Sequence, residues 1–290
     1  MKGATMAFTL HTVNGVRYLT SDLLRARHAF ATRCGGFSSL PHTASLNLAF
    51  GRGDDDGTVR DNLAAFADAV GFDPHAVVSV PQVHGKTVHR VDVCHRGLGY
   101  GRPAGEMSGD GYVTSAPGVV LGVKTDDCTP ILLEARRGGT VVAVAALHAG
   151  WRGTVADIAG EGVRSLRELA AETDVSDAPI DLFAAIGPCI HPCCFDVQDD
   201  CLTAIRAAVG DTPDPTHSDR SIAETCVRHR PDGRTAPDLP AMNAALLLRA
   251  GVPADHMDIC PLCTACRTDL FYSHRAMHGH RGTMLSVCML

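Results

Sequence analysis

The stretch that decides the fold covers residues 141–171 and reads VVAVAALHAGWRGTVADIAGEGVRSLRELAA. Its first seven residues are small or β-branched apolar residues, which is typical of a strand buried on both faces. In its second half the apolar side chains recur at helical spacing, as Ile158, Leu166 and Leu169 do. A buried strand followed by an amphipathic helix indicates an α/β layer, with residues 148–153 as the turn between them.

The same two patterns recur along the chain. Apolar runs predict further strands at 77–80, 119–123 and 180–186. Helical spacing predicts helices at 59–70, 155–171 and 239–250, the last ending before Gly251. Two segments lack both patterns and are predicted to be surface loops: the glycine-rich 96–108, and 211–237, which has four prolines and many charges and is expected to be partly mobile. We expect a single α/β (α+β) domain over residues 1–290.

Composition excludes several classes of protein. The chain of 290 residues is 45% hydrophobic, which is enough for a sizeable core, and its net charge of -6 lacks the basic excess that nucleic-acid binding needs. No apolar run approaches the roughly 20 residues that span a bilayer, and the first residues do not have the pattern of a secretory signal. We therefore expect a cytoplasmic protein that binds neither nucleic acid nor membrane.

The chain contains twelve cysteines. In a reducing compartment most cysteines are small buried apolar residues, and a few are metal ligands or nucleophiles. Cys260, Cys263 and Cys266 have the close spacing of metal ligands, but no fourth ligand for a closed structural site is evident in the sequence.

Candidate metal ligands follow three of the predicted strands. His84 comes shortly after the strand at 77–80, Cys128 shortly after that at 119–123, and His148 directly after that at 141–147. Ligand sites in open α/β sheets lie beyond the carboxyl ends of strands, where separate loops meet. Two imidazoles and one thiolate match a catalytic zinc site, which keeps its fourth position for water or substrate. The thiolate also suits Cu(I), so that copper stays possible.

Each of these residues also has an ordinary structural explanation. A single histidine after a strand is more often a hydrogen-bonded surface residue, and a single cysteine is more often part of the core. The context of His148 favours a site, because Gly150 and Gly153 let the backbone approach a ligand closely. Trp151 and Arg152 lie between these glycines and could stack on a base or bind an anion.

Nine short motifs along the chain resemble those of the YfiH-like family. In chain order they are RCGGFS (33–38), SLNL (45–48), QVHG (82–85), TDDCTP (125–130), HAGWRG (148–153), GPCI (187–190), CCFDV (193–197), DLP (238–240) and FYSHR (271–275). That family has been labelled multicopper polyphenol oxidase or laccase, and later described as purine nucleoside phosphorylases.

The resemblance implies a fold, a metal site and an activity. The implied fold is a layered α/β/β/α domain in which two mixed sheets lie between helices. The implied metal ligands are His84, Cys128 and His148, the three residues already selected from their positions after strands. The implied activity is phosphorolysis of adenosine, inosine and methylthioadenosine, with adenosine deamination in the same site. Purine nucleosides and phosphate would be the partners; the oligomeric state is left open.

The chain departs from the family pattern at three places. Asp126 stands where the family usually has alanine, so two carboxylates precede Cys128. Leu63 replaces an arginine that often follows the asparagine equivalent to Asn62, so the role of that arginine could move to Arg60. The sequence RGTM at 281–284 replaces the usual glycine-arginine-methionine ending.

Roles can be predicted for the remaining motif residues. Arg152 or Arg33 is predicted to bind phosphate, because a guanidinium offers a bidentate fork. Asp127 is predicted to carry a proton, in the place of the glutamate of other zinc deaminases. Asn47 is predicted to hydrogen-bond the substrate, and Trp151 to contact it.

Three other functions remain open at this stage. A copper-dependent polyphenol oxidase would need several histidine clusters, whereas the fifteen histidines include a single His-x-His spacing, at 278–280. A cysteine hydrolase could use Cys128 as nucleophile and His148 as base. A partner-binding protein that keeps the site only as a remnant is the third possibility.

Overall fold

The computed structural model describes residues 8–174, 177–229 and 233–290. Two six-stranded mixed sheets form the centre of the molecule. The first has the order β1-β2-β3-β16-β7-β4. Its strands are β1 Phe8–Val13, β2 Val16–Ser21, β3 Arg27–Ala31, β16 Met284–Met289, β7 Val120–Thr125 and β4 Val77–Val78. Only the β4–β7 pair of this sheet is parallel.

The second sheet has the order β15-β10-β8-β9-β6-β5. Its strands are β15 Met257–Ile259, β10 Ile180–Ile186, β8 Thr129–Arg137, β9 Thr140–Ala149, β6 Gly111–Thr114 and β5 Val88–Arg90. The two outermost pairs are parallel and the inner pairs are antiparallel. The prediction of mixed sheets is therefore confirmed.

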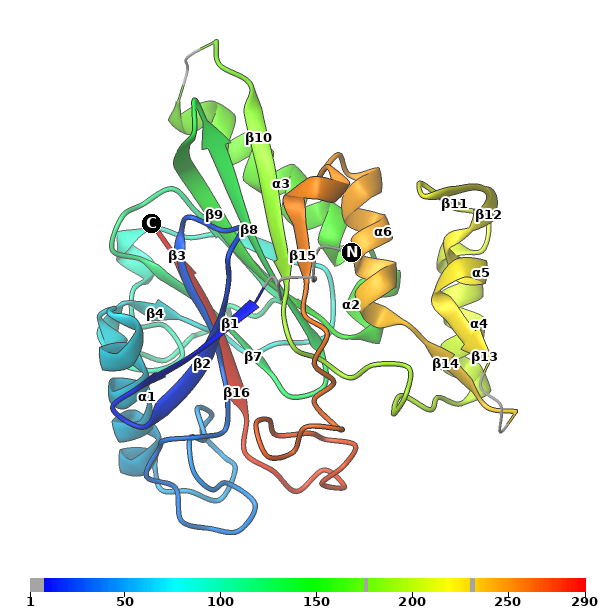
Figure 1. The fold of residues 1–290 in the computed structure, drawn as a ribbon. Helices are drawn as coiled ribbons and strands as arrows, with labels where there is room; N and C mark the ends of the chain where they lie inside the picture. The colour runs from blue at the N-terminus through cyan, green and yellow to red at the C-terminus, as the bar shows by residue number, and fades with distance from the viewer. Residues whose placement is uncertain (1–7, 175–176, 230–232) are drawn as a thin grey trace, which may run out of the picture.

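Helices cover the outer faces of both sheets (Figure 1). The helix α1, Asp56–Val70, contacts β2 and β3 of the first sheet. The helices α3, Ile158–Thr173, and α6, Leu239–Arg249, lie beside the second sheet, and α3 contacts β9. The described residues also contain three short 3-10 helices, Pro74–Ala76, Val93–His95 and Ala254–His256. The layered α/β/β/α prediction is confirmed.

The side chains of β9 show how the layers are held together. Val144 and Ala146 belong to the apolar core between the two sheets, whereas Ala145 and Leu147 belong to the core beneath α3. Alternate residues of a strand point to opposite faces, so this strand must be apolar on both. This is why residues 141–147 form an uninterrupted apolar run.

One predicted helix begins three residues later than expected and is preceded by a separate short helix. The range 155–171 was expected to be a single helix, but α2, Trp151–Val155, ends before α3 begins at Ile158. Asp157 separates them with a φ of 65°, and its side chain accepts a hydrogen bond from the backbone N–H of Gly160 at 3.0 Å. An aspartate in this left-handed conformation interrupts one helix and caps the next.

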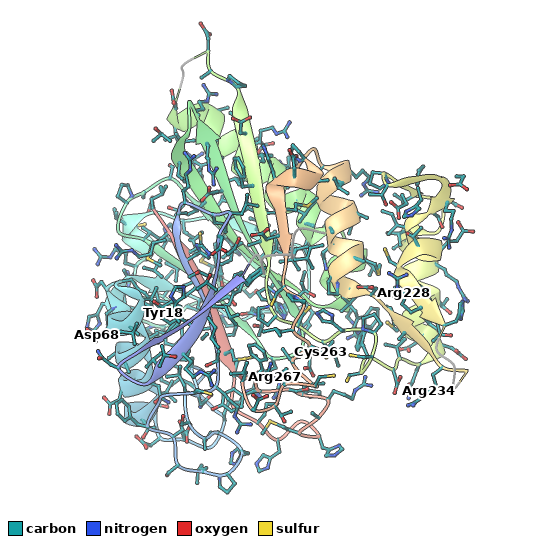
Figure 2. All side chains as sticks on the ribbon, in the orientation of Figure 1. Tyr18, Asp68, Arg228, Arg234, Cys263 and Arg267 are labelled. Carbon is teal, nitrogen blue, oxygen red and sulfur yellow. The ribbon has the colours of Figure 1, made fainter. Side chains whose placement is uncertain are left out.

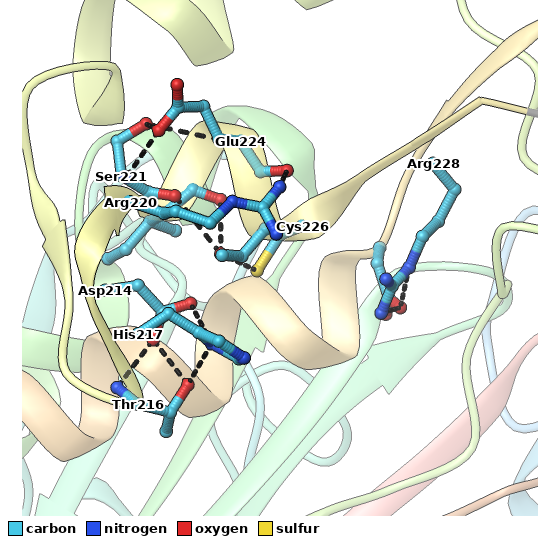
Figure 3. A network of polar contacts seen from close by, with 11 residues as sticks. Asp214, Thr216, His217, Arg220, Ser221, Glu224, Cys226 and Arg228 are labelled. Carbon is cyan, nitrogen blue, oxygen red and sulfur yellow. Dashed lines mark hydrogen bonds and ion pairs between the residues drawn. The ribbon is translucent and has the colours of Figure 1, made fainter.

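The segment 211–237 was expected to be a loop, and its described residues instead contain short elements. These are β11 Pro213–Asp214, β12 His217–Ser221, α5 Ile222–Cys226, β13 Val227–His229 and β14 Thr235–Pro237, which follow the helix α4 Asp199–Val209. Figure 3 shows the polar contacts that hold them, including the cap in which Ser221 and Glu224 bond to each other's backbone N–H. Residues 230–232 lie outside the described part. The expectation of partial mobility stays a prediction.

Candidate metal centre and its cavity

The structure brings His84, Cys128 and His148 together. His84 lies in the loop after β4, Cys128 in the turn between β7 and β8, and His148 near the end of β9. The Nε2 atom of His84 is 3.9 Å from the Sγ atom of Cys128, and one ligand atom from each of the three residues lies within 4.8 Å of the others. The two imidazole rings meet edge to face, with centroids 4.8 Å apart. Loops from both sheets therefore converge on one point.

Asp110 organises this centre, although the sequence did not single it out. Its Oδ1 atom is 2.8 Å from Nδ1 of His148, so only Nε2 of that ring is available to a metal. Its carboxylate also accepts hydrogen bonds from the backbone N–H groups of His84 at 2.9 Å and Gly85 at 2.7 Å. His84 has a φ of 59°, which is unfavourable for a histidine, and these bonds hold the loop in that conformation. No pattern in the sequence identifies Asp110, because the short strand β6 that follows it is not among the predicted strands.

The buried charges favour an ionised thiolate at the centre. Burial acts to raise the pKa of Cys128, but the charge of His148 and the hydrogen bonds to both imidazoles outweigh it and lower the pKa to about 6. Burial acts to lower the pKa of His148, but Cys128 and Asp110 outweigh it and raise the pKa to about 9. In the absence of a cation, the thiol and imidazole would thus form an ion pair.

The arrangement also fits a tetrahedral zinc ion. Zn–N and Zn–S bonds of about 2.0 and 2.3 Å place the nitrogen and sulfur ligands about 3.6 Å apart, close to the separation between His84 and Cys128. Gly150 makes room for this approach. A Cβ atom at this position would lie 2.9 Å from Cδ2 of His84 and 3.0 Å from Sγ of Cys128. The donor set and the space are those of a three-ligand site.

A cavity of about 980 Å³ opens beside the three ligands. Its walls are rich in basic and aromatic side chains. They include Phe50, Arg52, Arg60, Tyr100, Arg102, Lys124, Trp151, Arg152, Phe195, Arg275 and Arg281. Residues 99–104 of the glycine-rich loop form another part of the wall. Both the size and the mixture of apolar and charged groups suit a small anionic or aromatic ligand.

Trp151 and Arg152, which were predicted to contact the substrate and bind phosphate, lie beside each other at the cavity. Both line the cavity at the start of α2, and the guanidinium of Arg152 lies 4.3 Å from the centroid of the Trp151 ring. Arg152 is exposed, which leaves its guanidinium accessible to a ligand.

Arg33 and Asn47, which were predicted to bind phosphate or substrate, do not lie among the described residues that line the cavity. The guanidinium of Arg33 donates to the carbonyl groups of Ala44 and Thr268, the former at 2.7 Å. Asn47 is fully buried, donates to Asp54 at 2.8 Å and accepts from the backbone N–H of Thr283 at 3.0 Å. Both side chains use their hydrogen-bonding groups to hold neighbouring loops.

The two carboxylates before Cys128 have different surroundings. Asp127 accepts hydrogen bonds from Oγ1 of Thr264 at 2.6 Å and from the backbone N–H of Arg275 at 2.7 Å. Asp126 is buried and forms an ion pair with Arg281, yet burial raises the pKa of Asp126 to about 7. Its Oδ1 atom is buried and has no hydrogen-bond partner among the described residues. Both carboxylates line the cavity.

Comparison with known proteins assigns the chain to a family. The family model described as multi-copper polyphenol oxidoreductase laccase matches residues 27–290. The chain belongs to this family. It is 37% identical to the purine nucleoside phosphorylase YlmD of Geobacillus stearothermophilus, over 88% of this chain and 86% of that protein. It is 35% identical to a purine nucleoside phosphorylase of Deinococcus radiodurans, over 95% of this chain and 94% of that protein.

One further relative and one solved structure extend the comparison. The chain is 33% identical to the adenosine deaminase RL5 of an unknown prokaryotic organism, over 88% of this chain and 90% of that protein. The crystal structure of YlmD from Geobacillus stearothermophilus matches with a TM-score of 0.81 at 33% identity, covering 98% of this chain and 99% of that one. The family resemblance and the fold class predicted from the sequence are confirmed. Among the described residues, no helix is long and apolar enough to cross a membrane.

Proposed function

We propose that this chain is a zinc-dependent purine nucleoside phosphorylase that acts on adenosine, inosine and methylthioadenosine, and that it also deaminates adenosine. The observation that carries the proposal is the convergence of His84, Cys128 and His148 at the edge of a large cavity. Two of the relatives named above are called purine nucleoside phosphorylases and the third is called an adenosine deaminase, and these names support the same activities.

Phosphorolysis makes three demands on the cavity. The C1′–N9 bond of the nucleoside breaks and a bond from C1′ to a phosphate oxygen forms, while the purine leaves with a proton. The site must therefore bind phosphate beside the sugar, hold the base and deliver that proton. The basic residues of the cavity wall suit the first demand, and its aromatic residues suit the second.

Arg152 is the residue that we propose for phosphate binding. Arg152 is exposed and lines the same cavity as His148, whereas Arg33 is bound to backbone carbonyl groups elsewhere. Trp151 lies directly beneath it and can support a base or the guanidinium itself. Changing Arg152 to lysine should raise the KM for phosphate about tenfold, because a lysine cannot form the bidentate contact. Arg164→Lys, on the exposed face of α3, is the control.

Asp127 remains our proposal for the residue that carries the proton. Asp126 is a second candidate, because it lines the cavity and burial raises its pKa to about 7, close to the pH at which a general acid works best. Asp127→Asn and Asp126→Asn, compared under saturating substrate, should distinguish them. The variant that lacks the proton-carrying carboxylate should have a kcat at least about 100-fold lower, as expected for the loss of general acid catalysis.

His84, Cys128 and His148 would hold the zinc ion, whose Lewis acidity can polarise a substrate atom or acidify a water molecule. In deamination the amino group at C6 of adenosine is replaced by oxygen from water, and ammonia leaves. Asp110 would keep His148 oriented in both reactions.

A cysteine hydrolase is the second candidate function, because the lowered pKa of Cys128 and the nearby His148 also suit a nucleophile and its base. The two candidates differ in their response to inhibitors. A metalloenzyme should lose activity with a chelator and recover it with zinc. A cysteine hydrolase should lose activity with a thiol alkylator and be indifferent to the chelator.

The direct test uses metal-replete protein with adenosine, with and without phosphate. We expect adenine to be released only with phosphate, and inosine to form in either case. Neither product under either condition would reject both activities. Metal analysis of the same preparation distinguishes zinc from copper, and a copper protein that oxidises phenols would support the oxidase instead.

A further inference from the structure

A second cluster of metal-binding side chains lies apart from the three ligands described above. It consists of Cys193, Cys194, Cys263 and Cys266, whose four sulfur atoms all lie within 4.8 Å of one another. Cys263 is marked in Figure 2, close to Arg267. The sequence suggested Cys260, Cys263 and Cys266 as a group with no fourth ligand. The structure corrects this, because the missing ligands come from a segment about seventy residues earlier.

Cys260 is excluded from the cluster by its place in the fold. It is fully buried after β15, where its backbone N–H donates to the carbonyl of Ile186 at 2.8 Å. Burial raises the pKa of this thiol to about 11, as expected for a cysteine that is part of the core.

The spacing of the four sulfur atoms is that of a tetrahedral thiolate site. Four Zn–S bonds of about 2.3 Å place the sulfur atoms about 3.8 Å apart. The Sγ atom of Cys266 lies 3.5 Å from that of Cys193 and 3.3 Å from that of Cys194. Cys263 and Cys266 also have the Cys-x-x-Cys spacing common in structural zinc sites.

Backbone contacts beside the cluster hold residues 189–194 next to residues 263–266. Residues 189 and 263 form an isolated parallel bridge, and the backbone N–H of Thr264 donates to the carbonyl of Cys189 at 3.0 Å. The backbone N–H of His191 donates to Sγ of Cys263 at 3.4 Å. Backbone donors of this kind stabilise a metal-bound thiolate and fix its direction.

Burial of apolar surface does not account for this gathering of thiols. Cys193 and Cys266 are exposed and Cys194 is half-buried, so that only Cys263 belongs to the interior. None of these four described cysteines forms a disulfide bond, and the sulfur–sulfur distances of 3.3 and 3.5 Å are well beyond the roughly 2.05 Å of such a bond. A single thiophilic cation can be bound by all four sulfur atoms at once.

We propose that Cys193, Cys194, Cys263 and Cys266 bind a structural zinc ion. This ion would join two loops that form one wall of the cavity, since Ile190 and Phe195 belong to the first loop and Arg275 follows the second. The two loops also bind Asp127: Ile190 donates to its carbonyl at 2.9 Å, and Thr264 donates to its carboxylate. The site thus stabilises the cavity without touching the substrate.

The test is the metal content of the purified full chain by elemental mass spectrometry, with reductant and without chelator throughout. We expect about two zinc ions per chain, one for each ligand set, and about one in Cys266→Ser or in His84→Ala. Cys94→Ser removes an exposed thiol outside the four and should keep both ions. In His84→Ala, X-ray absorption at the zinc edge should show four sulfur ligands at about 2.3 Å.

Several results would overturn the proposal. They are a single zinc ion in both the unchanged chain and Cys266→Ser, nitrogen or oxygen ligands at the zinc edge of His84→Ala, or a non-reduced mass that reveals a disulfide among the four cysteines. If Cys266→Ser does not fold, a mercurial titration of His84→Ala replaces it. Zinc released in step with four thiols supports the site, and thiols that react without releasing zinc contradict it. None of these measurements depends on nucleoside turnover, so the proposed activity can fail independently.

Discussion

At the scale of single residues, Asp110 controls the metal ligands without being one of them. One carboxylate fixes the ring of His148 and the backbone of the His84 loop at the same time. Because it positions two of the three ligands, it determines both the direction in which His148 points and the conformation of His84.

We expect Asp110→Asn to weaken zinc binding at the three-ligand centre about 10- to 100-fold, the usual effect of changing the partner of a metal-bound histidine. An amide cannot stabilise the imidazole as a carboxylate does, although it keeps the same shape. The measurement is competition with a chelator of known affinity. Asp181→Asn, an exposed carboxylate at the start of β10, serves as the control. Equal affinities in all three proteins would show that Asp110 does not act through His148.

At the scale of secondary-structure elements, the two sheets are joined by polar contacts as well as by the apolar core. Glu134 of β8 is fully buried and accepts hydrogen bonds from the backbone N–H groups of Arg25 at 2.9 Å and Ala26 at 2.7 Å. It also pairs with Arg136, itself almost completely buried. A carboxylate of the second sheet thus holds the start of β3 in the first.

Glu134→Gln should lower the free energy of unfolding by about 3–5 kcal/mol, because it leaves the buried guanidinium of Arg136 without its counter-charge. The matched control is Glu172→Gln, which breaks an ion pair with Arg90 in which both side chains are 58% exposed. We expect the control to change stability by less than about 1 kcal/mol. Urea unfolding at constant zinc concentration measures both, and similar values would show that the buried pair contributes no more than the exposed one.

His28 of β3 should make stability depend on pH. It is buried, Nε2 accepts from the backbone N–H of Ser21 at 2.9 Å, and burial lowers its pKa below the ordinary value of 6.5. The unfolded chain therefore binds this proton more tightly than the folded chain does. Its stabilising effect is complete above about pH 6.5 and is lost as the pH falls towards the folded pKa, with a slope of at most about 1.4 kcal/mol per pH unit.

The corresponding measurement is urea unfolding between about pH 5 and 8, below and above the unperturbed pKa of histidine. His28→Gln, which does not titrate, should lose less stability on acidification than the unchanged chain. As a control, the variant His75→Gln, at an exposed histidine, should follow the unchanged chain. Parallel curves for His28→Gln and the unchanged chain would contradict the assignment.

At the scale of the whole molecule, the metal centre lies where the two sheets meet. His84 follows a strand of the first sheet, His148 belongs to a strand of the second, and Cys128 lies in the turn that connects them. A bound ion would link both sheets. Because these loops come together only in the folded chain, binding stabilises the fold by mass action.

Free zinc at about 100 times its dissociation constant should add about 2.7 kcal/mol to stability. This should raise the melting temperature by several degrees, at about 2–4 °C per kcal/mol. His84→Ala should lose the part of this rise that comes from the three-ligand centre. Melting curves over a range of zinc concentrations provide the comparison, and an identical rise in both proteins would place the ion elsewhere.

The sequence alone determined much of this description. The apolar run at 141–147 predicted a strand buried on both faces, and the helical spacing that follows predicted the layer above it. The positions of His84, Cys128 and His148 after predicted strands were enough to select them as one site. These features could be predicted because they depend on local periodicity and on where strands end.

Only the tertiary structure placed the residues whose partners are distant in the chain. Asp110 acquires its role from two loops that precede and follow it, and Cys193 and Cys194 become candidate ligands only beside Cys263 and Cys266. The structure likewise showed that the side chains of Asn47 and Arg33 form hydrogen bonds with neighbouring loops. A motif reveals which donors and acceptors a side chain has, but the fold decides which partners are near enough to use them.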